Sequence, residues 1–176
     1  MQYGFYFDAE RCIGCGSCAV ACKDWNDQKP GEPVQWRRVT TVERGRGTQL
    51  QLVNFSQSCL HCAKPACAGI CPVGAIAKRA ADGIVVQDQG KCIGCKACLS
   101  ACPFGVPQYG TDGTMQKCNL CLDRVQAGRT PACADACTTG ALHAGPLERL
   151  SKIAAKKNAQ RFAGATQPSM FIPASR

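Results

Sequence analysis

Residues 12–22 read CIGCGSCAVAC, and residues 92–102 read CIGCKACLSAC. Both stretches place four cysteines at the spacing C-x2-C-x2-C-x3-C. Three thiolates spaced this closely can wrap one iron-sulfur cluster, while the fourth binds a neighbouring cluster. Two copies of so specific a spacing are not expected by chance. The candidate ligands in this first and third group are Cys12, Cys15, Cys18, Cys22, Cys92, Cys95, Cys98 and Cys102.

Two further groups keep the opening C-x2-C and the closing C-x3-C but have a longer middle gap. The gap is four residues in the second group and eleven in the fourth. Because a flexible insertion adds little closure entropy, the third thiolate can still return to the same cluster. The sixteen cysteines therefore predict four 4Fe-4S clusters. The second and fourth groups are Cys59, Cys62, Cys67, Cys71, Cys118, Cys121, Cys133 and Cys137.

Other uses of so many cysteines are weaker interpretations. A zinc ion held by four thiolates would use two separate C-x2-C knuckles, which three cysteines at successive three-residue steps fit poorly. Disulfides within one such loop would be strained, and no export signal precedes Cys12 to indicate an oxidising compartment. A zinc-stabilised interaction module remains the alternative from a different functional class.

The net charge of +9 raises the question of nucleic-acid binding. Four clusters with their thiolates contribute roughly −8, which nearly cancels this surplus, so we expect no nucleic-acid partner. The apolar runs are shorter than the roughly 18–20 residues that cross a bilayer, so no membrane span is expected. Without its own export signal, the chain is expected in the cytoplasm or carried across a membrane by a partner.

The chain is built of repeats. Apolar segments at residues 5–8 and 83–88 precede the first and third groups, and the related segments 73–76 and 139–142 follow the other two. Each unit resembles half of a two-cluster ferredoxin, with a strand, a cysteine loop and a short helix. The predicted fold class is α+β, with tandem bacterial-ferredoxin-like modules in pseudo-two-fold symmetry. The outer module would combine residues 1–32 and 110–146, and the inner would span 56–109.

The remaining segments have weaker patterns. Residues 34–43 and 49–55 alternate apolar and polar side chains around a Gly-rich turn, which predicts a β-hairpin insert over 33–55. Residues 147–162 have the periodicity of an amphipathic helix. Residues 164–176 predict an extended tail. The hairpin could serve as a docking surface, and the tail could become ordered against a neighbouring subunit.

Four stretches carry a family resemblance: QYGF (2–5), ACKD (21–24), CPFGVPQY (102–109) and CNLCLDRV (118–125). On these motifs the chain, from residue 2 to about 150, resembles the iron-sulfur electron-transfer (beta) subunits of the dimethyl sulfoxide reductase family of molybdopterin oxidoreductases. The resemblance implies a non-catalytic relay subunit. In agreement, the sequence contains no nucleotide-binding glycine motif and no recognisable nucleophile with its base.

The resemblance also implies an exchange of ligands between groups. Cys95 stands where nitrate reductase relatives have a Trp, so four complete four-iron clusters are implied. The implied ligand sets are Cys12, Cys15, Cys18 with Cys137; Cys22 with Cys118, Cys121, Cys133; Cys59, Cys62, Cys67 with Cys102; and Cys71 with Cys92, Cys95, Cys98.

The implied partners are a large catalytic subunit with a molybdenum or tungsten bis-pterin cofactor, and a second redox partner. A membrane-anchor subunit is a further possibility that the short C-terminal extension leaves open. The alternative within electron transfer is a polyferredoxin subunit of a hydrogenase or of another tungsten oxidoreductase complex.

Overall fold

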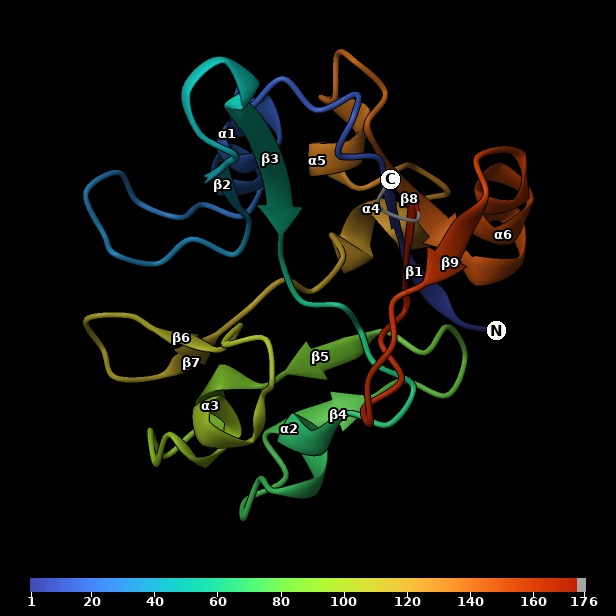
Figure 1. Ribbon diagram of the computed structural model, residues 1–176. Helices are drawn as coiled ribbons and strands as arrows, with labels where there is room; N and C mark the ends of the chain where they lie inside the picture. Colours follow the sequence, from blue (N-terminus) through green and yellow to red (C-terminus); the bar gives the residue numbers. More distant parts are fainter. Residues whose placement is uncertain (174–176) are drawn as a thin grey trace.

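A computed structural model describes residues 1–173 (Figure 1). The fold combines short helices with small sheets, in agreement with the predicted mixture of α and β structure. The strands are β1 (Tyr3–Phe7), β2 (Arg38–Arg44), β3 (Gln51–Gln57), β4 (Ile76–Lys78), β5 (Val85–Gln87), β6 (Gln108–Tyr109), β7 (Met115–Gln116), β8 (Leu142–Pro146), β9 (Ala159–Arg161) and β10 (Met170–Pro173). The helices are α1 (Ser17–Trp25), α2 (Ala66–Gly69), α3 (Ala97–Ala101), α4 (Leu122–Gln126), α5 (Ala132–Asp135) and α6 (Leu147–Lys156), with the 3-10 helices η1 (Gly47–Gln49) and η2 (Gln89–Lys91).

The largest sheet has the strand order β8-β1-β10-β9. Its central strand β1 pairs antiparallel with β8, through Phe5 and Ala144, and parallel with β10, through Phe5 and Met170. The segment predicted as an extended C-terminal tail thus contributes β10 to the sheet that holds the N-terminal strand. Residues 174–176 of that predicted tail lie outside the described part of the chain.

Successive side chains of β1 point to opposite faces of this sheet, as expected for a strand. Tyr6 packs against Leu150 and Ala154 of α6. Phe5 and Phe7 point the other way, into the main core. Burying each of these aromatic side chains contributes about 1.5–3 kcal/mol. The sheet therefore lies between α6 and the cysteine-bearing body of the molecule.

Cysteines form a large share of the main core. Five of its fifteen buried residues are cysteine, and the others are mostly small or aliphatic. The five are Cys18, Cys22, Cys59, Cys118 and Cys133.

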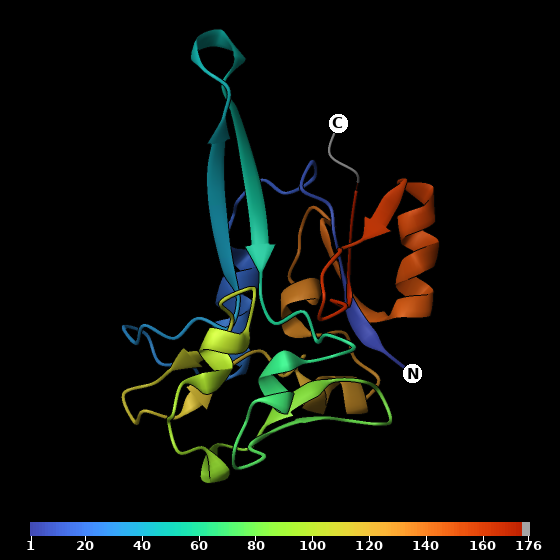
Figure 2. The same cartoon turned by 60° about the horizontal axis from the view of Figure 1, so that its bottom comes forward.

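The predicted hairpin is confirmed. Strands β2 and β3 pair in register from Arg38–Gln57 to Arg44–Gln51 and are connected through η1. Figure 2 shows this hairpin projecting from the rest of the molecule. Residues 40–52 are exposed, whereas Ser56 near the base of the hairpin is buried. The tip therefore contributes little to the core, while the base lies against it.

A second part of the molecule contains two small antiparallel sheets. Strand β4 pairs with β5, and β6 pairs with β7. In Figure 1 these strands lie with α2 and α3, below the central sheet. No helix within residues 1–173 has both the length and the apolar character needed to cross a membrane.

Candidate metal centres

Matching backbone conformations shape the first and third cysteine loops. Gly14 and Gly94, between the first two cysteines of their groups, have φ angles of 72° and 68°. Side chains rarely tolerate this left-handed region, so glycine suits both positions. A second left-handed residue, Gly16 or Lys96, precedes the helix that carries the next cysteine. The two loops therefore turn in the same way, as their identical spacing predicts.

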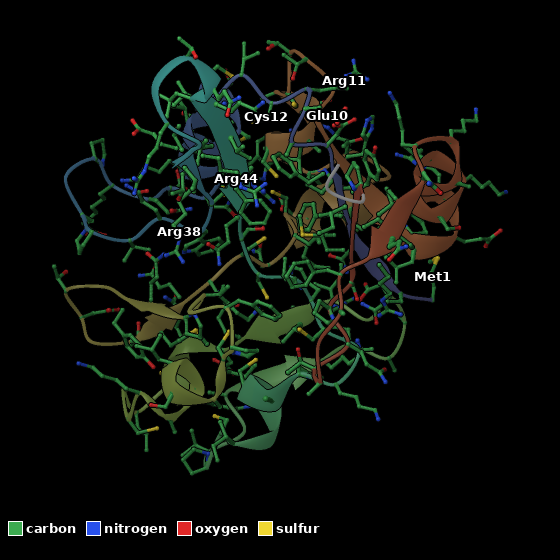
Figure 3. The ribbon with its side chains drawn as sticks, in the orientation of Figure 1. Met1, Glu10, Arg11, Cys12, Arg38 and Arg44 are labelled. Atoms are coloured by element: carbon green, nitrogen blue, oxygen red, sulfur yellow. The ribbon has the colours of Figure 1, made fainter. Side chains whose placement is uncertain are left out.

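The first thiol set, called site 1, lies beside the base of the hairpin. Cys12, Cys15 and Cys18 line one cavity together with Cys137 from the fourth group. Figure 3 labels Cys12 next to the hairpin, where the Asn54 amide donates to the Cys12 carbonyl oxygen at 3.0 Å. The Cys18 sulfur lies 3.4 Å from the Ser56 hydroxyl oxygen. The structure thus brings the fourth group to the first.

The second set, site 2, is buried and consists of Cys22, Cys118, Cys121 and Cys133. The Asn26 amide nitrogen lies 3.8 Å from the Cys22 sulfur and 3.9 Å from the Cys121 sulfur, so one side chain contacts thiols of two groups. Burial, followed by the neighbouring Cys133, raises the pKa of the Cys22 thiol to about 12. Burial and then Cys22 also raise the pKa of Cys118 well above its usual value.

The third set, site 3, consists of Cys59, Cys62, Cys67 and Cys102. Burial, followed by the neighbouring thiols of Cys59, Cys102 and Cys62, raises the pKa of Cys67 to about 12. Cys102, the last cysteine of the third group, thereby lies with three cysteines of the second.

The fourth set, site 4, surrounds a cavity lined by Cys71, Cys92, Cys95 and Cys98. Two backbone amides point at its sulfurs: Ala75 N–H donates to Cys71 at 3.2 Å, and Met115 N–H to Cys92 at 3.3 Å. The Tyr109 hydroxyl oxygen lies 3.1 Å from the Cys98 sulfur. Such donors stabilise a thiolate more than a thiol.

The four sites follow one another through the molecule. Burial raises the pKa of Cys18 in site 1, and the proximity of Cys133 in site 2 raises it further. The raised pKa of Cys118 in site 2 includes a contribution from Cys59 in site 3. Cys67 of site 3 and Cys71 of site 4 pack against the same small core around Cys98. The sequence of neighbours is therefore site 1, site 2, site 3 and site 4.

The chemistry of these sites fits iron-sulfur clusters. All sixteen cysteines are free thiols, and buried thiols with raised pKa values ionise readily only when they bind a metal. Two buried N–H groups, Arg37 Nε and His61 Nε2, have no hydrogen-bond acceptor in residues 1–173. An anionic cluster at site 1 or 2 would supply an acceptor for Arg37. In the same residues, no three His, Cys, Asp or Glu side chains converge closely enough to hold a single metal ion.

Comparisons with known proteins agree with this chemistry. Residues 50–147 match a family model described as "4Fe-4S dicluster domain", and residues 11–75 match a second model with the same description. One chain of the anaerobic dimethyl sulfoxide reductase of Escherichia coli strain K12 is 46% identical over 160 residues, which cover 86% of this chain and 77% of the relative. The protein belongs to the iron-sulfur subunits of the molybdopterin oxidoreductases.

Other members of this family differ in the reaction that their names describe. The formate dehydrogenase iron-sulfur subunit of Wolinella succinogenes is 39% identical over 184 residues, covering 91% of this chain and 89% of the relative. A sulfite dehydrogenase subunit of Allochromatium vinosum is 39% identical over 160 residues, covering 80% of this chain and 67% of the relative. The family resemblance inferred from the motifs is thus confirmed, and with it electron transfer through 4Fe-4S clusters.

Several residues near the thiols could not be identified from the sequence. Lys117 is 1% exposed and donates to the carbonyl oxygens of Val85 and Cys118. His61, which stands between Cys59 and Cys62 in the sequence, is fully buried. Its Nδ1 accepts from the Val85 N–H at 3.1 Å, and burial followed by Lys117 lowers its pKa well below the usual value, so the ring is neutral. Nothing in the spacing of these polar residues distinguishes them from surface residues.

Proposed function

We propose that this chain is a relay that passes single electrons through four 4Fe-4S clusters, between a catalytic subunit with a molybdenum or tungsten bis-pterin cofactor and a second redox partner. The continuous order of sites 1 to 4 carries this proposal. Each bound cluster would supply one reversible electron-transfer step, and the chain would hold the clusters in sequence.

The contacts between cysteine groups support the proposed ligand sets. Cys137 shares a cavity with the first group, and Cys71 shares one with the third. Asn26 contacts the sulfurs of Cys22 and Cys121, and Cys102 influences the pKa of Cys67. We therefore assign one cluster to each site, with all sixteen cysteines as iron ligands.

Strand pairing supports the proposed module boundaries. The strand that precedes the first group, β1, pairs with β8, which follows the fourth. In the same way β5, before the third group, pairs with β4, after the second. Two like units with interleaved sequence order, an outer module of residues 1–32 and 110–146 and an inner module of 56–109, account for both pairings.

The two terminal sites offer routes to partners. Cys15 of site 1 and Cys95 of site 4 are exposed, whereas every cysteine of site 2 is buried. The apolar side chains next to the terminal sites, Ile13 and Ile93, are 68% and 64% exposed. An electron would enter through one end and leave through the other, while site 2 remains shielded from water.

Anaerobic purification of the full-length tagged chain from its source organism would test the proposed partner. We expect a large subunit to co-purify, with molybdenum or tungsten and a pterin in metal and cofactor analysis. Substoichiometric reductant added to this complex should reduce both the iron-sulfur clusters and the pterin-bound metal, because electrons pass between them. A nickel-containing large subunit would instead support the hydrogenase-associated polyferredoxin, and would contradict the proposed partner.

A further inference from the structure

Arg37 is a buried cation at the base of the hairpin. Its side chain is buried, and the residue is only 3% exposed. Its two terminal nitrogens donate to the hydroxyl oxygens of Ser56 at 2.9 Å and Ser58 at 2.7 Å. The guanidinium carbon lies 4.6 Å from the ring centroid of Phe5. These contacts fix the guanidinium in one place within the main core.

No Asp or Glu within residues 1–173 forms an ion pair with Arg37. The ion pairs within residues 1–173 are formed by other Lys and Arg residues, and among these cations only Arg124 has a buried side chain. An unpaired buried charge is strongly unfavourable, so buried charges are paired or face a compensating group. Arg37 therefore has no compensating carboxylate among residues 1–173.

The thiols that act electrostatically on Arg37 belong to sites 1 and 2. Burial alone would lower the pKa of Arg37, but Cys133, Cys118, Cys18 and Cys22 together raise it above its usual value. Cys18 is a member of site 1, and the other three are members of site 2. Phe5, over whose ring the guanidinium lies, also packs in the main core that contains Cys18 of site 1 and Cys22, Cys118 and Cys133 of site 2. The guanidinium thus lies in the part of the core where the two sites meet.

Two hydrogen-bond features point from Arg37 toward sulfur. Because Arg37 donates to the Ser56 oxygen, the hydroxyl hydrogen of Ser56 is free to point at the Cys18 sulfur, 3.4 Å away. A thiolate bound to iron has no hydrogen of its own, so Ser56 must then be the donor. In addition, the buried Nε of Arg37 has no acceptor in the described residues, and a cluster sulfur could accept its hydrogen.

We propose that Arg37 is the shared counter-charge of the clusters at sites 1 and 2, and that it raises the reduction potentials of both. This inference rests on the proposed cluster sites. Arg37 acts as a positioning residue, since it touches site 1 through Ser56. A cluster gains one negative charge on reduction, so a fixed neighbouring cation stabilises the reduced form more than the oxidised form.

The effect should be large enough to measure. An opposite charge within about 4–6 Å shifts a proton equilibrium about tenfold to a thousandfold, and a one-electron equilibrium responds to the same electrostatic energy. We therefore expect Arg37→Gln to lower the ratio of reduced to oxidised cluster at a fixed potential by at least about tenfold, which equals about 59 mV. Only the signals of sites 1 and 2 should shift.

The test is a reductive titration of the full chain in its complex, followed by electron paramagnetic resonance. Arg37→Lys retains the charge and should keep both potentials close to those of the parent. Arg38→Gln is the matched control, because it removes the same charge from the neighbouring residue. Arg38, labelled in Figure 3, is half-buried and donates to Gln57 instead of approaching a cysteine. Full iron content with four unchanged potentials in Arg37→Gln would overturn the proposal.

A second variant covers the case in which Arg37→Gln does not accumulate with its iron. Arg37→Met removes the charge but keeps an apolar side chain of similar length in the core, and should lower the potentials of sites 1 and 2. Unchanged potentials of both sites in that variant would then refute the proposal. Iron and sulfide analysis of the parent separates the two hypotheses, because absence of clusters there contradicts the proposed function, whereas unshifted variants contradict only the role of Arg37.

Discussion

Tyr109 offers a way to perturb one site without removing a ligand. Its hydroxyl oxygen lies 3.1 Å from the Cys98 sulfur in site 4. Burial, followed by the contact with Cys98, raises the pKa of Tyr109, so the phenol keeps its proton. When Cys98 is bound to iron as a thiolate, Tyr109 must be the donor. Tyr109→Phe removes this hydrogen bond and leaves the ring in place.

The expected size of the effect follows from hydrogen-bond energetics. A hydrogen bond to a charged group contributes about 1.5–3 kcal/mol, and only the difference between the oxidised and reduced cluster affects the potential. If that difference is about 0.5–1.5 kcal/mol, the potential of site 4 falls by about 20–65 mV in Tyr109→Phe. The potential falls because the Tyr109 hydroxyl stabilises the reduced cluster, which is the more negative form, and the variant lacks this donor.

A reductive titration followed by electron paramagnetic resonance measures this shift. Tyr6→Phe is the matched control, since the Tyr6 hydroxyl donates to Asp8 at 3.5 Å and not to a sulfur. One signal should shift in Tyr109→Phe, and none should shift in Tyr6→Phe. A shift toward higher potential, equal shifts of all signals, or no shift with full iron content would refute the reasoning.

Three further predictions concern the ligands, the clusters and the hairpin. Cys137→Ser should remove or alter the cluster of site 1 alone, with loss of up to about four irons per chain. Loss of the signal from site 2 would contradict the ligand exchange. The control is Ser151→Ala in α6. Anaerobic removal of iron by a chelator should abolish the cooperative thermal transition in circular dichroism, because metal binding contributes directly to folding energy and five core residues are cysteines; an unchanged transition would contradict this. Val42 and Val53 pair across the hairpin, so an Asn-Gly turn between them can replace residues 43–52. This shortening should leave iron content and potentials unchanged because the tip is exposed. Loss of iron would show that the tip supports a site.

Local features of the fold were predictable from the sequence. The repeated C-x2-C-x2-C-x3-C spacing predicts the loops, since it fixes which thiols lie together within one turn of chain. The alternation in residues 34–43 and 49–55 predicted β2 and β3, and the apolar periodicity after residue 147 predicted α6. The helix was expected to continue to residue 162, but α6 ends at Lys156 and Ala159–Arg161 form β9 instead, because they pair with β10. Where the prediction holds, the decisive contacts are close in sequence, so the pattern alone contains them.

Features that depend on distant contacts were not predictable in this way. Spacing cannot show that Cys137 lies with the first group, and this pairing was inferred only from a family resemblance. The short segment Met170–Pro173 has no strong strand pattern, yet it pairs with β1 because the sheet there has an open edge. The burial of Arg37 between Ser56, Ser58 and Phe5 also depends on segments from three parts of the chain.

The proposed relay requires that sixteen cysteines hold four 4Fe-4S clusters. The decisive measurement is iron and acid-labile sulfide analysis of the anaerobically purified complex, after subtraction of the clusters that belong to the partner. We expect about sixteen irons and about sixteen sulfides per copy of this chain. Zinc without sulfide in freshly isolated protein would contradict the electron-transfer account and would show that the cysteines are a structural scaffold.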